Sequence, residues 1–268
     1  MFDPSRSLTI SALQAMKSRN EKITALTAYD FSFGRILDEA GVDVVLVGDS
    51  LGMVVQGHET TLPVTVEDMI YHTLAVTRGV RRAMVIVDMP YMSYSHREQA
   101  LSTAASLIRA GGQMVKLEGG TGTRIDVIRA LVDQNVPVCG HLGLLPQSVY
   151  RMGGFVMQGR NAVAAQELFN EAMSLQEVGI SLLILEGMPA ELASEITQAL
   201  TIPTLGIGAG PGCNGQILVL YDLLGITPGK KLRFAKNYLA ESGSVSAAVN
   251  RYVDEVRSGL FPEAIHWI

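Results

Sequence analysis

Short runs of apolar residues recur along the chain, and each run gives way to glycine or polar residues. The runs cover residues 23–28, 42–47, 83–87, 114–117, 136–139, 180–185, 202–207 and 216–220. Because neighbouring positions are apolar rather than alternating with polar ones, both faces of such a strand would be buried, which is typical of a parallel sheet. The pattern therefore predicts eight buried parallel strands.

Segments with helical character separate nearly all of these runs. Expected helices cover residues 31–40, 65–77, 97–110, 124–134, 162–178 and 191–200, with a leading helix at 9–18 and helix again from Lys230 to an aromatic tail at 261–268. Thr9 or Ser11 would cap the leading helix, and Asp30 the next one. Strict alternation favours a parallel sheet with helical crossovers.

Eight such units in a chain of this length predict an α/β fold, the (β/α)₈ TIM barrel, with an open doubly wound sheet as the alternative. No shift in composition marks a boundary, so residues 1–268 are expected to form a single barrel domain with a short N-terminal helix and a C-terminal helical tail.

Composition narrows the class of protein. The chain has 268 residues and a net charge of −5, which argues against bulk binding of nucleic acid or an anionic membrane. The two cysteines, Cys139 and Cys213, do not indicate a disulfide framework. The N-terminus lacks the order of a signal peptide, and the apolar runs are too short to span a bilayer. We therefore expect a cytoplasmic protein.

Polar residues gather at the C-terminal ends of the expected strands, where the active site of a barrel lies. They are Asp49, Ser50, Asp88, Lys116, Glu118, His141 and Glu186. Three of them, Asp49, Asp88 and Glu118, are hard oxygen donors without a thiolate or histidine pair beside them, which suits Mg²⁺ better than Zn²⁺. The alternative is that each acid merely caps the helix that follows it.

The other polar residues allow more than one interpretation. Lys116 lies two residues before Glu118, so both point to the same side of a strand. It could pair with an anionic substrate, form a structural ion pair with Glu118, or act as a Schiff-base lysine. Glu186 follows an apolar run and could be a general base or a capping acid. His141 could hydrogen-bond a substrate carbonyl, hold a water bound to the metal without binding the metal itself, or be structural.

Several motifs together resemble the ketopantoate hydroxymethyltransferase family. They are Gly48-Asp49-Ser50-Leu51-Gly52, Val87-Asp88-Met89-Pro90-Tyr91, Val115-Lys116-Leu117-Glu118-Gly119-Gly120, Gly140-His141-Leu142-Gly143-Leu144, Pro146-Gln147-Ser148 and Leu185-Glu186. The resemblance runs from about residue 8 to the C-terminus. It implies a barrel of the phosphoenolpyruvate/pyruvate type.

The resemblance also implies a reaction. Family members transfer a hydroxymethyl group from 5,10-methylenetetrahydrofolate to 3-methyl-2-oxobutanoate, which gives 2-dehydropantoate on the route to pantothenate and coenzyme A. They use Mg²⁺, expected here as one ion per subunit, to stabilise an enolate, and they form homo-oligomers, commonly decamers. One departure is Gly187, where a bulkier or polar residue is expected.

By motif, the resemblance assigns each residue a role. Asp49, Asp88 and Glu118 would bind Mg²⁺, and Glu186 would be the proton acceptor. Asp49, Ser50, Asp88 and Lys116 would bind substrate. Two other functions stay open from the sequence: a Mg²⁺ lyase or mutase of 2-oxo acids, which would usually carry a reactive cysteine on a mobile loop, and a binding protein without catalysis.

Overall fold

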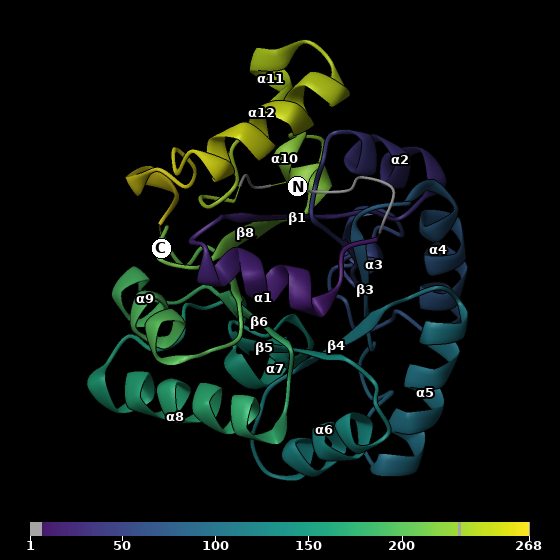
Figure 1. Cartoon of the computed structure of the whole chain (residues 1–268), viewed down its shortest axis with the longest axis vertical. Helices are drawn as coiled ribbons and strands as arrows, with labels where there is room; N and C mark the ends of the chain where they lie inside the picture. The colour runs from purple at the N-terminus through teal and green to yellow at the C-terminus, as the bar shows by residue number, and fades with distance from the viewer. Residues whose placement is uncertain (1–6, 230–231, 268) are drawn as a thin grey trace.

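The computed structural model describes residues 7–229 and 232–267, and its parallel strands close into a barrel (Figure 1). The strands are β1 (Ile23–Thr27), β2 (Val44–Val47), β3 (Met84–Asp88), β4 (Met114–Glu118), β5 (Val138–Gly143), β6 (Leu182–Glu186), β7 (Thr204–Ile207) and β8 (Gly215–Leu218). They pair in sequence order, and β8 pairs back with β1. The predicted barrel is confirmed, and the open sheet is excluded.

Helices form a ring outside the barrel (Figure 1). The larger ones are α1 (Ile10–Ser18), α2 (Phe31–Glu39), α4 (Val66–Gly79), α5 (Arg97–Arg109), α6 (Thr123–Asp133), α8 (Ala162–Val178), α9 (Ala190–Ala199) and α12 (Val245–Arg257). Short helical turns are α3 (Leu51–Val54), η1 (Pro146–Ser148), α7 (Val149–Met152), α10 (Leu220–Leu223), α11 (Leu239–Ser242) and η2 (Ala264–His266). A turn rather than a helix joins β7 to β8.

The buried core explains why the strand sequences are apolar on both faces. One face of each strand packs inside the barrel and the other packs under the helices, and nearly every strand residue is buried. Asp30 caps α2 by accepting a hydrogen bond from the backbone N–H of Phe33, and Thr9 caps α1 in the same way. Within the described residues, no helix combines the length and the apolar character needed to cross a membrane.

Two predictions about the C-terminal part are wrong in detail. Leu220 begins α10 instead of extending β8. The helix expected from Lys230, a position outside the described residues, is absent from residues 232–238, and α12 begins only at Val245, where Ser244 caps it. The non-helical part crosses the barrel mouth, because Leu232 and Phe234 line the cavity there.

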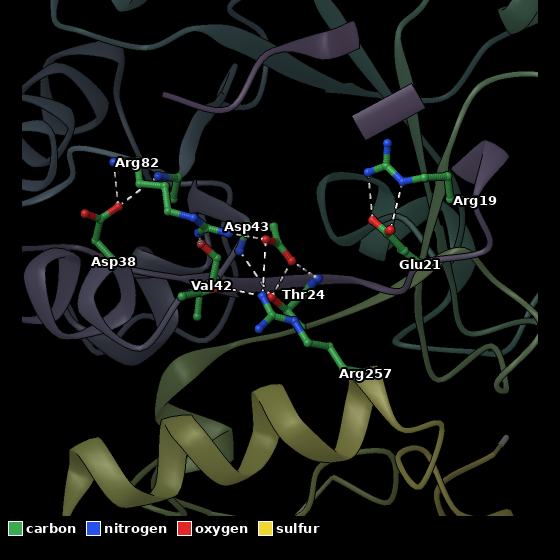
Figure 2. A network of polar contacts seen from close by, with 10 residues as sticks. Arg19, Glu21, Thr24, Asp38, Val42, Asp43, Arg82 and Arg257 are labelled. Atoms are coloured by element: carbon green, nitrogen blue, oxygen red, sulfur yellow. Dashed lines mark hydrogen bonds and ion pairs between the residues drawn. The ribbon is translucent and has the colours of Figure 1, made fainter. Parts of the chain in front are cut away.

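An ionic network around Asp43 lies at the N-terminal end of the barrel (Figure 2). The buried Asp43 carboxylate accepts hydrogen bonds from the backbone and hydroxyl of Thr24 and from the guanidinium of Arg82, and Arg257 of α12 lies 3.4 Å away. A hollow of about 1220 Å³ lies at this end, with cationic and anionic side chains in equal number around it. Balanced charges at this face of a barrel, several of them paired with one another, indicate a role in stability rather than chemistry.

Candidate active site

Strand register brings the predicted polar residues together at the C-terminal end of the barrel. Asp88 at the end of β3 lies opposite Lys116 on β4. Glu118, at the end of β4, lies opposite His141 on β5. Glu186 at the end of β6 lies opposite Gly143. Side chains two residues apart on a strand share a face, so Lys116 and Glu118 both point into the barrel.

These side chains line one cavity of about 300 Å³ at the barrel mouth. Its polar lining includes every residue singled out from the sequence: Asp49, Ser50, Asp88, Lys116, Glu118, His141 and Glu186. Apolar side chains from the strands and from the loops above complete the wall. Met53 and Val54 of α3 belong to it, so the glycine-rich connection after β2 forms part of the rim. The cavity thus combines a charged floor with apolar sides.

Lys116 is the only cation among the cavity's carboxylates in the described chain. Its Nζ donates to Asp88 Oδ1 at 2.6 Å, and Asp88 Oδ2 accepts from the backbone N–H of Asp49 at 2.9 Å. Burial lowers the pKa of Lys116, but the surrounding carboxylates outweigh burial and hold it above its usual value. Burial, followed by the charge of Asp88, raises the pKa of Asp49 to about 7, against the opposing charge of Lys116. A protonated lysine can bind an anion, but it is a poor Schiff-base nucleophile.

Gln147 links two of the carboxylates, and the sequence arguments did not identify it. Its side-chain amide donates to Asp49 Oδ2 at 2.8 Å, and its backbone N–H donates to Glu118 Oε2 at 3.0 Å. Tyr94 donates its hydroxyl to Gln147 Oε1 and so fixes the orientation of the amide. The only signal in the sequence was the Pro146-Gln147-Ser148 motif, which says nothing about which groups the amide contacts.

His141 lies between two carboxylates. Its Nδ1 is 3.7 Å from Glu118 Oε1, and its Nε2 is 3.2 Å from Glu186 Oε2, although neither contact has the alignment of a hydrogen bond. Burial lowers the pKa of His141, so the imidazole is neutral at neutral pH. The Glu186 side chain is 15% exposed and faces the cavity, whereas Glu118 is almost fully enclosed. Of these two acids, Glu186 is therefore the one that a bound molecule can reach.

Ser50 contacts a residue that sequence reasoning also missed. Its hydroxyl lies 2.8 Å from the hydroxyl of Tyr29, which follows β1. Ser50 is the residue before α3 but makes no capping bond, so its hydroxyl stays available at the cavity. Tyr29 is buried, and its contact limits the directions in which Ser50 can point.

The capping explanation for the three carboxylates is wrong. Helix α5 is capped by His96, and α3 and α6 have no side-chain cap at all.

Glu118 Oε1 is buried without a hydrogen-bond partner, as is expected of an oxygen that binds a cation or a substrate. Within the described chain, no three His, Cys, Asp or Glu side chains are gathered closely enough to hold an ion by themselves. That arrangement still fits Mg²⁺, which commonly takes one or two carboxylates and completes its shell with water and substrate oxygens.

Gly187 supports a sharp turn after the general-base candidate. Its φ is +56°, a conformation that other residues rarely adopt. A side chain there would also meet Leu144 Cβ at 3.0 Å. Its N–H donates to Ile207 O, and its carbonyl accepts from Gln158, so both neighbouring segments are fastened to this turn. The departure from the expected residue therefore has a backbone reason.

Comparison with known proteins bears directly on this site. A family model described as ketopantoate hydroxymethyltransferase matches residues 7–264. The chain is 53% identical over 259 residues to the 3-methyl-2-oxobutanoate hydroxymethyltransferase of Shewanella loihica, covering 97% of this chain and 98% of the relative. It is 52% identical over 267 residues to the protein of the same name from Xylella fastidiosa strain M12, covering 99% and 98%.

Solved structures with a similar fold are much more distant in sequence. A phosphoenolpyruvate phosphomutase from Streptomyces platensis subsp. rosaceus aligns with a TM-score of 0.62 at 12% identity, covering 90% of each chain. A phosphonopyruvate hydrolase, solved with oxalate and Mg²⁺, aligns with a TM-score of 0.60 at 12% identity, covering 78% of this chain and 80% of that one. At this identity the likeness concerns the fold, which agrees with the expected phosphoenolpyruvate/pyruvate type of barrel.

Proposed function

Because the chain belongs to the ketopantoate hydroxymethyltransferase family, we propose that it transfers a hydroxymethyl group from 5,10-methylenetetrahydrofolate to 3-methyl-2-oxobutanoate. The products are 2-dehydropantoate and tetrahydrofolate, and the reaction serves pantothenate and coenzyme A biosynthesis. The observation that carries this proposal is the gathering of Lys116, Glu186 and the three carboxylates at one cavity of the barrel mouth.

Asp49, Asp88 and Glu118 would hold one Mg²⁺ per subunit, with one or two of them bound to the ion directly and the rest through water. The partnerless Glu118 Oε1 supports this assignment, and so does the anchoring of Asp49 and Glu118 by a single glutamine. Both oxygens of Asp88 already accept hydrogen bonds, but each carboxylate oxygen has a second lone pair for a metal. The bound metal would supply Lewis-acid polarisation of the keto acid's carbonyl, which acidifies the C3–H.

Glu186 would remove the C3 proton of the keto acid. Its carboxylate is accessible from the cavity, and no lysine or arginine pairs with it in the described chain. The neutral imidazole of His141 lies 3.2 Å from Glu186 Oε2 and would restrict the directions that this carboxylate can take. The carbanion equivalent formed at C3 would then bond to the one-carbon unit of the folate. Across the complete reaction, both bonds of this carbon to the folate nitrogens break, water supplies the oxygen of the hydroxymethyl group, and the proton from C3 and one from water end on the two nitrogens of the released tetrahydrofolate.

Lys116 and Ser50 would orient the keto acid. A protonated Lys116 offers positive charge to the substrate carboxylate at the floor of the cavity. Ser50, held by Tyr29, offers a hydroxyl that can donate to a substrate oxygen. Asp49 and Asp88, which lie beside this lysine, would contact the same end of the substrate. Fixing the keto acid through its carboxylate and its keto oxygen would expose C3 to Glu186.

The two other functions considered from the sequence are less well supported. A lyase or mutase of 2-oxo acids would need its reactive cysteine, but Cys139 lies buried on β5 and Cys213 is buried between β7 and β8. A binding protein without catalysis would gain nothing from several buried carboxylates, which are costly to keep inside a barrel.

The cellular location and the oligomeric state are part of the same proposal. Two buried free thiols suit a reducing compartment, and we place the enzyme in the cytoplasm. A homodecamer remains a prediction from the family resemblance. Light scattering coupled to size-exclusion chromatography would measure the mass of the assembly directly.

Two assays on the full-length protein test the proposed function. In D₂O with Mg²⁺ and 3-methyl-2-oxobutanoate, we expect exchange at C3, followed by NMR. Addition of 5,10-methylenetetrahydrofolate should then give 2-dehydropantoate. Chelation of the metal should stop both reactions, and Mg²⁺ should restore them. A protein that neither exchanges the C3 proton nor forms the product would refute the proposal.

A further inference from the structure

Asp222 is a carboxylate of the cavity that the chemistry above leaves unused. It lies on α10, just after β8, and it lines the same cavity as Glu186. The Thr227 hydroxyl donates to its Oδ1 at 2.6 Å. In the part of the chain that the structure describes, no lysine, arginine or histidine forms an ion pair with it, and its Oδ2 has no hydrogen bond from the protein.

The surroundings of Asp222 disfavour a bare charge. Burial raises the pKa of its carboxyl, and the negative charge of Glu186 raises it further, while the Thr227 hydrogen bond works in the opposite direction. A carboxyl that is largely enclosed and has a single hydrogen bond costs stability unless a ligand completes its bonding. Such a group at an active-site cavity therefore indicates a binding partner with N–H or O–H donors.

The cavity wall near Asp222 differs from the floor that would take the keto acid. Val219 lines the cavity on one side of Asp222 in sequence, and Pro228 lines it just after Thr227. Phe234, from the segment that crosses the mouth, adds an aromatic ring. Besides Glu186, this part of the cavity wall offers apolar side chains and the carboxylate of Asp222, which suits a flat heterocycle with one polar edge.

We propose that Asp222, oriented by Thr227, binds the 2-amino and N3–H edge of the folate's pterin ring. This inference rests on the proposed function, which supplies a folate as co-substrate. The edge presents two parallel N–H donors, as a guanidinium does, and a carboxylate can accept both with its two oxygens. Thr227 is then a positioning residue, because its hydroxyl fixes the plane of the carboxylate.

The arrangement also separates the two substrates. The keto acid would occupy the floor with Lys116 and the carboxylates, and the pterin would occupy the side near β8. Glu186 and Asp222 line the same cavity, so both acids would face the space between the two substrates. The one-carbon unit carried by the pterin would thus face the carbon from which Glu186 takes a proton.

The test is to replace Asp222 by asparagine and to measure binding and the half-reaction separately. In D222N an amide NH₂ would face an N–H donor, so we expect the Kd for tetrahydrofolate, measured by anaerobic calorimetry on the full-length protein, to rise about 10- to 100-fold. The KM for 5,10-methylenetetrahydrofolate should rise with it. Exchange at C3 of the keto acid needs no folate and should keep its rate.

Two further variants give the test its controls. T227V should raise the Kd for tetrahydrofolate less than D222N does, because the carboxylate remains but is less well oriented. D133N, which changes an exposed carboxylate of α6, should leave the Kd for tetrahydrofolate unchanged.

Unchanged folate binding in D222N would overturn the inference while the proposed function stood. Parallel loss of exchange and folate binding would indicate a structural role and would also overturn it. A wild-type protein without exchange or transfer would refute the proposed function itself.

Discussion

Lys116 keeps its charge inside an apolar barrel because three carboxylates surround it. Burial alone would favour the neutral amine, but the charges of Asp88, Glu118 and Asp49 outweigh that effect. One lysine cannot neutralise three carboxylates, and burial together with the charge of Asp88 raises the pKa of Asp49 to about 7 despite the charge of Lys116. The site therefore has an excess of negative charge, which a divalent cation would relieve, while its one lysine stays available to an anionic substrate.

Replacement of Glu186 by glutamine should separate binding from proton removal. The amide keeps the size of the side chain but cannot accept the C3 proton, so the exchange rate should fall by about 100-fold or more. Binding of the keto acid and Mg²⁺, measured by calorimetry, should stay close to that of the wild type, because Glu186 is not proposed to hold the metal or the carboxylate and keto oxygens of the substrate. Undiminished exchange in E186Q would rule out this residue as the base.

Gln147 should control how well the protein binds its metal. In Q147L, Asp49 and the Tyr94 hydroxyl lose their partner while the backbone bond to Glu118 remains. We expect about a 10-fold weaker affinity for Mg²⁺ or Mn²⁺ in the absence of substrate, measured by calorimetry or by Mn²⁺ resonance. Q198L, on the exposed side of α9, is the control. Unaltered metal affinity in Q147L would mean that the amide does not orient the carboxylates.

At the scale of elements, the end of β5 sets the position of the base on β6. Gly143 has a φ of +94°, and a Cβ there would overlap the carbonyl oxygen of Glu186. That same oxygen accepts a hydrogen bond from the Leu144 N–H at 2.8 Å. The backbone of Glu186 is thus held by a contact that only glycine permits.

G143A should therefore displace the base as well as destabilise the fold. We expect the free energy of unfolding to fall by more than about 1 kcal/mol, and the C3 exchange rate per folded molecule to fall with it. G243A is a matched control, because Gly243 also has a positive φ but has open space where a Cβ would be. It should lose stability only and keep its exchange rate. Equal exchange rates in the two variants would argue against the link between β5 and the base.

Elements with a strong local signal were predictable from the sequence, and long-range contacts were not. Runs that are apolar on both faces indicated β2 and β6. Closure of the strands into a barrel places Asp49 and Glu186, at the ends of these strands, at the same barrel mouth. Gln147 and Tyr94 come from loops, and only the folded chain shows that they meet. Residues 232–238 were misjudged because their conformation depends on packing over the barrel mouth, not on local propensity.

At the scale of the whole molecule, the two ends of the barrel have different tasks. At the C-terminal end, several carboxylates line a cavity, and their negative charge is only partly balanced by cations. At the N-terminal end, Asp43 is paired with Arg82, Arg257 and Thr24, and α1 lies across the barrel in Figure 1. Lys17 of α1 donates to the carbonyl of Thr197 in α9 and to that of Ile202 just before β7, which ties this helix to the barrel. Stability and chemistry should therefore be separable by mutation.

R82L tests that separation, because it removes the inner cation of the network in Figure 2 and leaves Asp43 buried with weaker compensation. Breaking a buried ion pair typically costs 3–5 kcal/mol, and since Arg257 and Thr24 remain, we expect a loss of about 3 kcal/mol in the free energy of unfolding. Urea denaturation would measure this loss.

The control is R19L, which breaks the exposed pair with Glu21, drawn in the same figure. It should change stability little, because solvent screens such pairs. Exchange at C3 per folded molecule should be the same in both variants and in the wild type. A slower exchange in R82L alone would show that the two ends of the barrel are mechanically coupled, since no residue of the network reaches the cavity.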